Sequence, residues 1–398
     1  MVHKNDFPIF QAHPNLVYLD SAATTQKPQT VIDAITKFYS QENASINRGL
    51  YKLGAQVTRR YTEVREKVAQ FIQAKEAREI VFTSGTTDGI NLVAHSFLLP
   101  QLESGDEVLI STMEHHANLI PWQQVCKATG AKLKTIPISE DGELDQKAFS
   151  SLLNVRTKML GIVHISNTLG TINPVQALIA EAHEKGIPVL VDAAQSAAHY
   201  PLNVQELDAD FLVFSGHKVF GPTGTGILYG KAAHLEKMEP IRFGGDMINR
   251  VQFAETSFAD FPKRFEAGTT NIAGVIGLGA ALDYIKSLDR DEIIKYLADL
   301  RDYALQALEG IDGLKIVGQA REKSALHSFV LQDVHPHDIA TFLGADNIAI
   351  RAGNHCTQPL MDAWGLPGTV RASFSIYNTR ADIDRLVESL KNIQSFFG

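Results

Sequence analysis

A lysine that directly follows an apolar run is the first residue whose position suggests chemistry. Residues 209–216 read ADFLVFSG and predict a buried strand, which is followed by His217, Lys218 and the glycine-rich run VFGPTGTGILYG. An ammonium group in this position is partly removed from water, which prepares it to form a Schiff base with an aldehyde. The glycines do not predict a nucleotide-binding loop, because the Gly-Lys-Ser/Thr ending of such loops is absent.

Two other segments place polar side chains at the ends of predicted elements, where they could bind other parts of a molecule that carries such an aldehyde. Asp192 ends the apolar run IPVLVD, where a carboxylate either caps the next helix or is held for a cationic group. Thr86 and Thr87 open a helical segment, where hydroxyls and backbone N–H groups either cap the helix or bind a phosphate. With Lys218 they fit a pyridoxal phosphate site: the lysine takes the aldehyde, the aspartate the pyridine nitrogen and the helix start the phosphate.

Polar residues after two more strand-like runs extend this set. The segment EHHAN follows DEVLIST, and we expect His115 in it to stack on the cofactor ring and to handle protons. The alternative is that His115 is an ordinary loop residue. Asn167 follows the run GIVHIS, and its alternative is turn formation, for which asparagine is well suited.

The two cysteines of the chain lie in contrasting surroundings. Cys356 lies in RAGNHCTQPL, a loop in which Arg351 and His355 are expected to be positive neighbours that lower a thiol pKa and expose a reactive thiolate. Cys126 shares a helical face with Leu119 and Trp122, so we expect it to be a small core residue.

An arginine in a further predicted strand completes the set of candidate residues. Arg371 has the apolar neighbours Val370, Ala372 and Phe374 in a predicted strand. A guanidinium group in that company needs an anion, and the carboxylate of an amino acid fits its bidentate geometry. A structural salt bridge is the alternative.

The elements that must position these residues form an α/β pattern. Apolar runs at 79–84, 106–112, 132–138, 158–166, 187–194, 209–216 and 225–230 alternate with helical segments such as 177–186, which predicts a mostly parallel sheet buried between helices. After about residue 270 come two predicted amphipathic helices (274–288 and 292–311), strands at 314–318, 327–332, 347–353 and 370–378, and a helix at 382–397. We therefore expect a large domain, 15–284, and a smaller α+β domain formed by 1–14 and 285–398.

Composition excludes several classes of protein. The 398 residues are 44% hydrophobic and carry a net charge of −8, which offers no basic field for nucleic acid. No apolar run approaches the roughly 18 residues of a membrane helix, and the first residues do not resemble a secretory signal, so we expect no membrane partner and a cytoplasmic location. Two cysteines are too few for a disulfide framework or a four-cysteine zinc site, and no metal is expected.

Taken in order over essentially the whole chain, these motifs resemble a known family. The segments YLDSAATTQKP, SGTTDGINLVA, MEHHANLIPW, VHISNTLGTINP, VDAAQS, FSGHKVFGPTGTGILYG, RFEAGTTN, RAGNHCTQPLM and VRASFSIYNTR resemble those of the SUF-type (group II) cysteine desulfurases. These belong to the class V aminotransferase family of pyridoxal-phosphate enzymes. The resemblance implies fold type I, similar to aspartate aminotransferase, with a mainly parallel seven-stranded sheet in the large domain.

The resemblance also implies a role for each candidate residue. Lys218 would be the Schiff-base lysine, Asp192 would hold the pyridine nitrogen, and His115 would stack on the ring. Gln195 and Asn167 would lie near the ring oxygen, and the substrate carboxylate would be bound by Arg371 with Asn167 and Arg351. Cys356 would accept the sulfur. The phosphate would be held by Thr86, Thr87, Ser215 and His217, with Thr269 supplied by the second subunit of a homodimer.

The implied activity is removal of sulfur from L-cysteine. Its products would be L-alanine and a persulfide on Cys356, which passes to a SufU- or SufE-like acceptor of the SUF system for iron–sulfur cluster assembly. Selenocysteine lyase, or another fold type I pyridoxal-phosphate enzyme in which Cys356 is incidental, is the nearer alternative. The more distant alternative is a non-catalytic sulfur carrier that retains only the fold.

Three segments depart from the family pattern. Many members have two histidines before the cysteine where this chain has Asn354-His355, and His-Arg-Gly where it has Asn47-Arg48-Gly49. The usual Gly-Thr-Pro-Asn becomes Gly268-Thr269-Thr270-Asn271. His337 resembles a residue of members that pass sulfur to a zinc-containing acceptor.

Overall fold

The structure, a computed structural model, describes residues 3–47 and 49–397, and its largest element is a seven-stranded sheet. The strand order is β2-β8-β7-β6-β5-β3-β4. The strands are β2 (Ile80–Thr83), β3 (Glu107–Ser111), β4 (Lys132–Ile136), β5 (Thr157–Val163), β6 (Val189–Asp192), β7 (Phe211–Ser215) and β8 (Gly226–Gly230). β8 is antiparallel to both of its neighbours, and the pairs from β7 to β4 are parallel. The predicted mainly parallel seven-stranded sheet is therefore confirmed.

Two apolar clusters cover the two faces of this sheet. In β6, Val189 and Val191 belong to one cluster and Leu190 belongs to the other. Successive side chains of a strand point to opposite faces, so a strand buried on both faces is an unbroken apolar run. This accounts for the strands in the middle of the sheet, whereas the edge strand β4 carries Lys132 and Lys134 and is buried only at Ile136.

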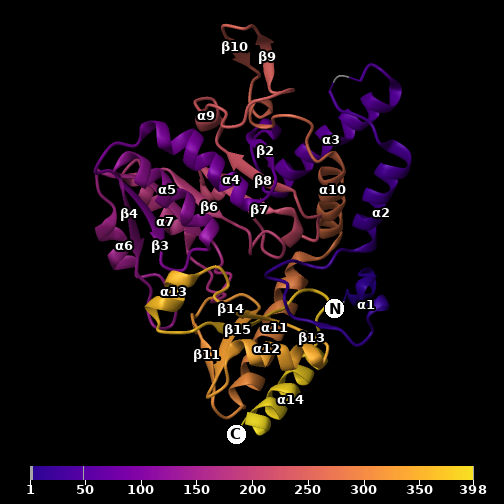
Figure 1. Cartoon of the computed structure of the whole chain (residues 1–398), viewed down its shortest axis with the longest axis vertical. Helices are drawn as coiled ribbons and strands as arrows, with labels where there is room; N and C mark the ends of the chain where they lie inside the picture. Colours follow the sequence, from indigo (N-terminus) through magenta and orange to yellow (C-terminus); the bar gives the residue numbers. More distant parts are fainter. Residues whose placement is uncertain (1–2, 48, 398) are drawn as a thin grey trace.

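Ten α-helices precede the C-terminal part of the described chain, and most of them lie around the sheet (Figure 1). They are α1 (Ile9–Ala12), α2 (Gln29–Lys37), α3 (Lys52–Phe71), α4 (Thr86–Leu92), α5 (Ile120–Thr129), α6 (Gln146–Leu152), α7 (Val175–Glu184), α8 (Val204–Leu207), α9 (Ala232–Leu235) and α10 (Ile272–Ser287). Two short 3₁₀ turns matter for the site: His116–Asn118, which leads into α5, and Gly216–Lys218, which follows β7.

The prediction that residues 274–288 form an amphipathic helix is wrong in one respect. The helix α10 is present, but it is buried almost all round, because α2 and α3 both pack against it. Gly277 lies against Ile35 and Gly279 against Val64, so the small residues on this helix admit close neighbours on more than one side. An apolar sequence without a polar face is the signature of such a buried helix.

The C-terminal part of the chain forms a second, antiparallel sheet at the lower end of Figure 1. Its strand order is β11 (Leu314–Val317), β12 (Leu326–Leu331), β15 (Thr369–Ser373) and β14 (Arg351–Gly353). The accompanying helices are α11 (Arg290–Glu309), α12 (Pro336–Ala345), α13 (Gln358–Ala363) and α14 (Arg380–Phe397). The short strand β1 (Val17–Tyr18) pairs with β13 (Ile348–Ala349), so the N-terminal segment is bound to this part. The proposed domain boundaries at 14/15 and 284/285 remain a prediction.

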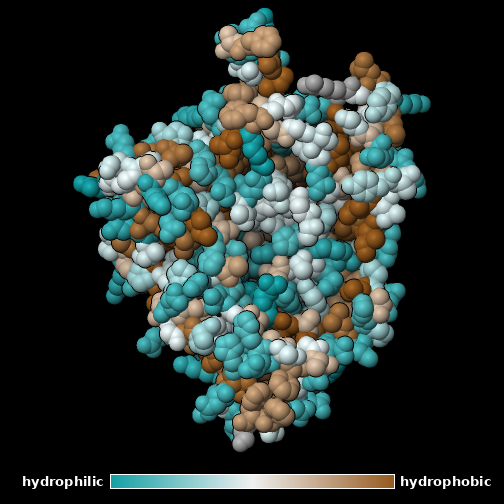
Figure 2. All heavy atoms as spheres, viewed as in Figure 1, coloured by the Kyte–Doolittle hydropathy of each residue, from teal (hydrophilic) through white to brown (hydrophobic). Residues whose placement is uncertain are grey.

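A hairpin projects from the opposite end of the molecule (Figure 1). It consists of β9 (Ile248–Val251) and β10 (Thr256–Phe258). Its tip shows apolar spheres beside hydrophilic ones in Figure 2, and Val251 and Phe253 are both exposed to solvent. Among the described residues, no helix combines the length and the apolarity needed to cross a membrane.

Candidate active site

One cavity gathers almost all of the candidate residues. It lies beyond the carboxyl ends of the parallel strands and has a volume of about 270 Å³. The candidate residues that line it are Thr86, Thr87, His115, Asn167, Asp192, Gln195, Ser215, His217, Lys218, Arg351, Cys356 and Arg371. Of the candidate set, only Thr269 is not brought to this cavity.

Lys218 and Asp192 form the charged centre of the cavity. Asp192 ends β6 and is 3% exposed, and its Oδ1 accepts a hydrogen bond of 2.9 Å from the Ala194 amide. Burial raises the pKa of Asp192, against the effects of that hydrogen bond and of Lys218. Burial lowers the pKa of Lys218 to about 8, although Asp192 acts in the opposite direction. The amine of Lys218 is therefore much closer to neutral than an exposed lysine would be.

His115 is a neutral imidazole with a defined tautomer. Its Nδ1 accepts a hydrogen bond of 3.0 Å from the Ala117 amide, so the ring proton of the neutral form lies on Nε2. Burial lowers the pKa of His115 to about 3, and the positive charge of Lys218 acts in the same direction. The ring can therefore present a flat face or an N–H donor to a ligand, but not a positive charge.

The start of α4 supplies a cluster of hydroxyl groups. Ser215 Oγ accepts a hydrogen bond of 2.9 Å from the Thr86 amide and lies 2.8 Å from Thr86 Oγ1. The close approach of β8 to the residue before α4 makes this possible: a Cβ atom at Gly226 would overlap the backbone of Gly85. Together with Thr87 and His217, these groups offer the donors that a phosphate requires.

Arg371 is already engaged by a carboxylate. It is 2% exposed, and its two terminal nitrogens bond to Asn167 O at 2.9 Å and to Asp20 Oδ1 at 3.1 Å. The same Asp20 carboxylate binds Arg351 at 3.1 to 3.2 Å. Arg371 thus forms the structural salt bridge that was the alternative interpretation, while its Nε and Asn167 Oδ1 remain buried without hydrogen-bond partners.

The loop that carries Cys356 has an unusual backbone. His355 and Cys356 both adopt left-handed conformations, with φ of 51° and 57°, and they follow Gly353 with φ of 118°. Asn167 Nδ2 holds this loop by donating a hydrogen bond of 2.7 Å to the His355 carbonyl. Cys356 is exposed at the cavity.

The prediction that His355 is a positive neighbour of the thiol is wrong. Its ring is 7% exposed, and its Nε2 lies 3.1 Å from Thr369 O, which can only accept a hydrogen bond. Burial lowers the pKa of His355 to about 3, and the charge of Arg371 acts in the same direction. The side chain is neutral, so Arg351 and Arg371 are the cations that line the cavity with Cys356.

The structure also places the remaining residues that the sequence analysis singled out. Gln195 Nε2 donates a hydrogen bond of 2.8 Å to Ala22 O, which fixes its amide at the cavity. Cys126 is buried in α5 beside Trp122, so its assignment to the core is confirmed. Thr269 lines a different cavity with Thr270 and Asn271. Arg48, within the Asn47-Arg48-Gly49 segment, lies outside the described residues.

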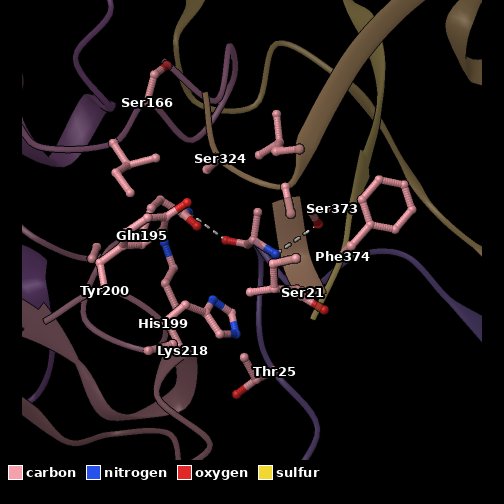
Figure 3. A pocket seen from close by; sticks show the side chains of 17 residues that line it. Ser21, Thr25, Ser166, Gln195, His199, Tyr200, Lys218, Ser324, Ser373 and Phe374 are labelled. Carbon is pink, nitrogen blue, oxygen red and sulfur yellow. Dashed lines mark hydrogen bonds between the residues drawn. The ribbon is translucent and has the colours of Figure 1, made fainter. Parts of the chain in front are cut away.

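A second cavity shares lining residues with the first, and Figure 3 shows the side chains that line it. Its volume of about 40 Å³ leaves room for water but not for a cofactor. Lys218 and Gln195 line both cavities, and His199, Ser21 and Ser373 line only this one. The larger cavity is therefore the candidate site.

The sequence analysis missed two acidic residues that bond to residues in or beside the site. Asp20 follows the strand-like run VYL, which is the same signal that identified Asp192. Glu114 stands directly before His115, and its carboxyl group is buried with 1% exposure.

The chain belongs to the class V aminotransferase family. The family model described as aminotransferase class V matches residues 17–386, which is most of the chain. This confirms the predicted family.

Relatives and solved structures narrow the similarity further. A protein of Halalkalibacterium halodurans named probable cysteine desulfurase is 49% identical over 398 residues, covering 99% of this chain and 98% of the relative. A protein of Vibrio cholerae with the same description is 48% identical, covering 96% of each chain. The crystal structure of the cysteine desulfurase CsdA from Escherichia coli matches with a TM-score of 0.93 at 40% identity, covering 99% of this chain and 98% of that one. This likeness confirms the predicted fold type.

Proposed function

We propose that this chain is a pyridoxal-phosphate-dependent cysteine desulfurase of the SUF type. The observation that carries the proposal is the single cavity at which Lys218, Asp192, Arg371 and the exposed Cys356 meet. The names of the relatives at 48–49% identity over nearly the whole chain support the same activity.

The residues of the cavity fit pyridoxal phosphate. The hydroxyls of Thr86, Thr87 and Ser215, with His217, suit its phosphate, and the buried carboxyl of Asp192 suits its pyridine nitrogen. Asn167 Oδ1 and Arg371 Nε are buried polar atoms without partners, which a bound ligand would satisfy. When bound, pyridoxal phosphate supplies an aldehyde that captures an amine and a ring that withdraws electrons from it.

Lys218 would then serve as the proton carrier at the substrate α-carbon. Its lowered pKa of about 8 means that an appreciable share of the free side chain is a neutral amine near neutral pH. Asp192, at the end of the neighbouring strand β6, would offer its buried carboxyl group to the pyridine nitrogen of the cofactor. Arg371 and Asn167 would orient the substrate carboxylate.

Cys356 would remove the sulfur. Its thiolate forms an S–S bond with the substrate sulfur while the substrate Cβ–S bond breaks, and that bond's electron pair stays on Cβ. Protonation of Cβ completes alanine, and the enzyme keeps the sulfur as a persulfide. The exposed position of Cys356 supports transfer of this sulfur to a second protein.

The partner proteins are part of the proposal. His337 Nε2 lies 3.6 Å from the position of a Cβ at Gly353, so this histidine borders the cysteine loop and supports docking of a SUF acceptor there. A homodimer is also part of the proposal, because the resemblance to the SUF-type family implies one. We retain the cytoplasm as the proposed location.

The test compares Cys356→Ala with the wild type on L-cysteine. Because the sulfur acceptor is lost, alanine production should fall by at least about 100-fold, with the visible spectrum of the bound cofactor unchanged. Cys126→Ala is the matched control, because it removes the buried thiol, and should keep its activity. Alanine production from Cys356→Ala at the wild-type rate would overturn the assignment, and loss of cysteine turnover with retained L-selenocysteine turnover would favour the lyase.

A further inference from the structure

The buried carboxyl group of Glu114 has no part in the chemistry described above. The residue is 1% exposed, and among residues 3–47 and 49–397 no lysine, arginine or histidine forms an ion pair with it. Burial raises the pKa of Glu114 to about 8, with hydrogen bonds acting in the opposite direction. Burying an unpaired carboxyl group is costly, so its position calls for a structural reason.

Three donors from three different elements converge on this carboxyl group. Glu114 Oε1 accepts hydrogen bonds from Ser111 Oγ at 2.5 Å and from the Val163 amide at 3.0 Å. Glu114 Oε2 accepts one from Asn118 Nδ2 at 2.6 Å. Ser111 ends β3, Val163 ends β5, and Asn118 ends the 3₁₀ turn, so the carboxyl group joins two strand ends to the start of α5.

The surroundings leave this network one arrangement. Asn118 Oδ1 accepts a hydrogen bond of 2.9 Å from Trp122 Nε1, which directs the Asn118 amide nitrogen toward Glu114. A Cβ atom at Gly161 would lie 2.8 Å from Trp122 Nε1 and 3.2 Å from Asn118 Oδ1, so the sheet packs tightly against the network. A fully satisfied buried network of this kind holds its members rigid.

Residues 115 and 116, which follow Glu114, contact both the cavity wall and the loop that carries Cys356. His115 lines the cavity, as does Val163, which pairs with Asp192 in the sheet. On its other side, the His116 amide donates a hydrogen bond of 2.7 Å to Cys356 O, and His116 Nε2 accepts one of 3.1 Å from the Gln358 amide. Residues 115 and 116 therefore connect the cavity wall with the cysteine loop.

We propose that Glu114 is a positioning residue whose carboxyl group fixes His115 in the cavity and, through His116, the backbone of the Cys356 loop. The inference rests on the proposed function, since it concerns how that site is held in place. It assigns Glu114 no contact with substrate or cofactor.

The first test measures hydrogen exchange in Glu114→Gln, with and without pyridoxal phosphate. In either orientation the glutamine NH2 group would face an N–H donor, that of Val163 or that of the Asn118 side chain, so a hydrogen bond is lost, two donors are opposed and the segment loosens. Exchange in residues 114–118 and 354–358 should be at least about tenfold faster than in the wild type, with the remaining sheet amides unchanged. Ser111→Ala removes one donor only, so it should show a smaller increase in the exchange rate of these two segments. It replaces Glu114→Gln as the test if that variant does not fold.

The matched control is Glu79→Gln. Glu79 is also a buried glutamate that accepts backbone hydrogen bonds, but its partners Glu76 and Ala232 lie outside residues 111–118 and outside the cysteine loop. Its variant should leave exchange in both segments at the wild-type rate. Unchanged exchange in Glu114→Gln, or an equal acceleration in Glu79→Gln, would overturn the proposal.

A second readout separates this inference from the proposed function. In Glu114→Gln, kcat per bound cofactor should fall by about tenfold with KM for L-cysteine within twofold, and the visible circular dichroism of the bound cofactor should weaken, because His115 is misplaced. Wild-type dichroism and kcat in this variant would contradict the inference alone. A wild-type protein that binds no pyridoxal phosphate would instead contradict the proposed function.

Discussion

At the scale of single residues, burial separates groups of the same chemical type. Cys126 lies in the core, where burial raises its thiol pKa to about 11, whereas Cys356 is exposed on a left-handed backbone. A thiol must ionise before it can attack sulfur, so Cys126 is inert at neutral pH. Composition shows only that two cysteines are present, and their surroundings decide which one can react.

The lowered pKa of Lys218 predicts how cofactor capture depends on pH. Only the neutral amine attacks an aldehyde, and burial lowers the pKa to about 8 from the ordinary 10.5, so the neutral fraction rises as the pH passes through 8. The rate at which cofactor-free protein captures pyridoxal phosphate, followed by visible absorbance, should therefore reach half of its maximum near pH 8.

A model amine provides the control for this prediction. The same titration with N-α-acetyl-lysine, whose exposed ε-amine has an ordinary pKa of about 10.4, should reach half of its maximal rate about two pH units higher. A midpoint for the protein close to that of the model amine would contradict the prediction. Lys218→Ala should show no capture at any pH, which confirms that the signal arises from this side chain.

Sequence position identifies the candidate residues that end strands, but not the residues that hold them. Lys218 and Asp192 could be found because each directly follows an apolar run. The contact between Asp20 and Arg371 joins residues 351 positions apart, and no local pattern reports such a pair. The neutral state of His355 could not be predicted for the same reason. Its ring is buried against Thr369 of β15, which is 14 residues away in the sequence.

At the scale of elements, the runs of apolar residues predict the strands but not their order. The sequence indicates a mostly parallel sheet, yet β8 is inserted antiparallel between β2 and β7. This insertion brings Gly226 of β8 against Gly85, directly before the first turn of α4. The glycine is needed there because the two backbones leave no room for a side chain.

Gly226→Ala is therefore expected to destabilise the protein and to weaken cofactor binding. The added methyl group would force the Gly85 backbone away and displace Thr86, at a cost of roughly 3 kcal/mol in the free energy of unfolding. Urea unfolding and a pyridoxal phosphate titration measure the two effects. An alanine that leaves both unchanged would show that the Gly85 backbone can move away from β8 without cost.

Gly344 is the matched control for this substitution. It lies near the end of α12, and a Cβ atom there would meet nothing within 4 Å. Since alanine favours the helix over glycine, Gly344→Ala should raise the free energy of unfolding by about 0.5 kcal/mol and leave cofactor binding unchanged.

At the scale of the whole molecule, buried histidines should control the response to acid. Burial lowers the pKa values of six histidines from the ordinary 6.5 to about 3 or 4. They are His115, His164, His199, His217, His327 and His355. Below pH 6.5 the unfolded chain binds protons at these rings and the folded chain does not, so stability falls as the pH falls.

Two carboxyl groups act in the opposite direction. Burial raises the pKa values of Glu114 and Asp192, so the folded protein holds protons there that the unfolded chain has already released. Their contribution is complete at low pH and is lost as the pH rises. The six histidines take up nearly six protons on unfolding and Glu114 releases about one, which leaves a net uptake of about four to five protons near pH 5.5, and Asp192 acts to lower this number.

The cofactor-free protein should therefore lose thermal stability between pH 7 and pH 5.5. Over this range exposed carboxylates of ordinary pKa remain ionised in both states, so the buried histidines dominate the change. Calorimetric unfolding in buffers of different ionisation enthalpy counts the protons directly, and Tm at the two pH values gives the direction. A Tm that stays constant over this range, with an uptake of less than one proton, would mean that water reaches these rings in the folded state, because only desolvation holds them neutral below pH 6.5.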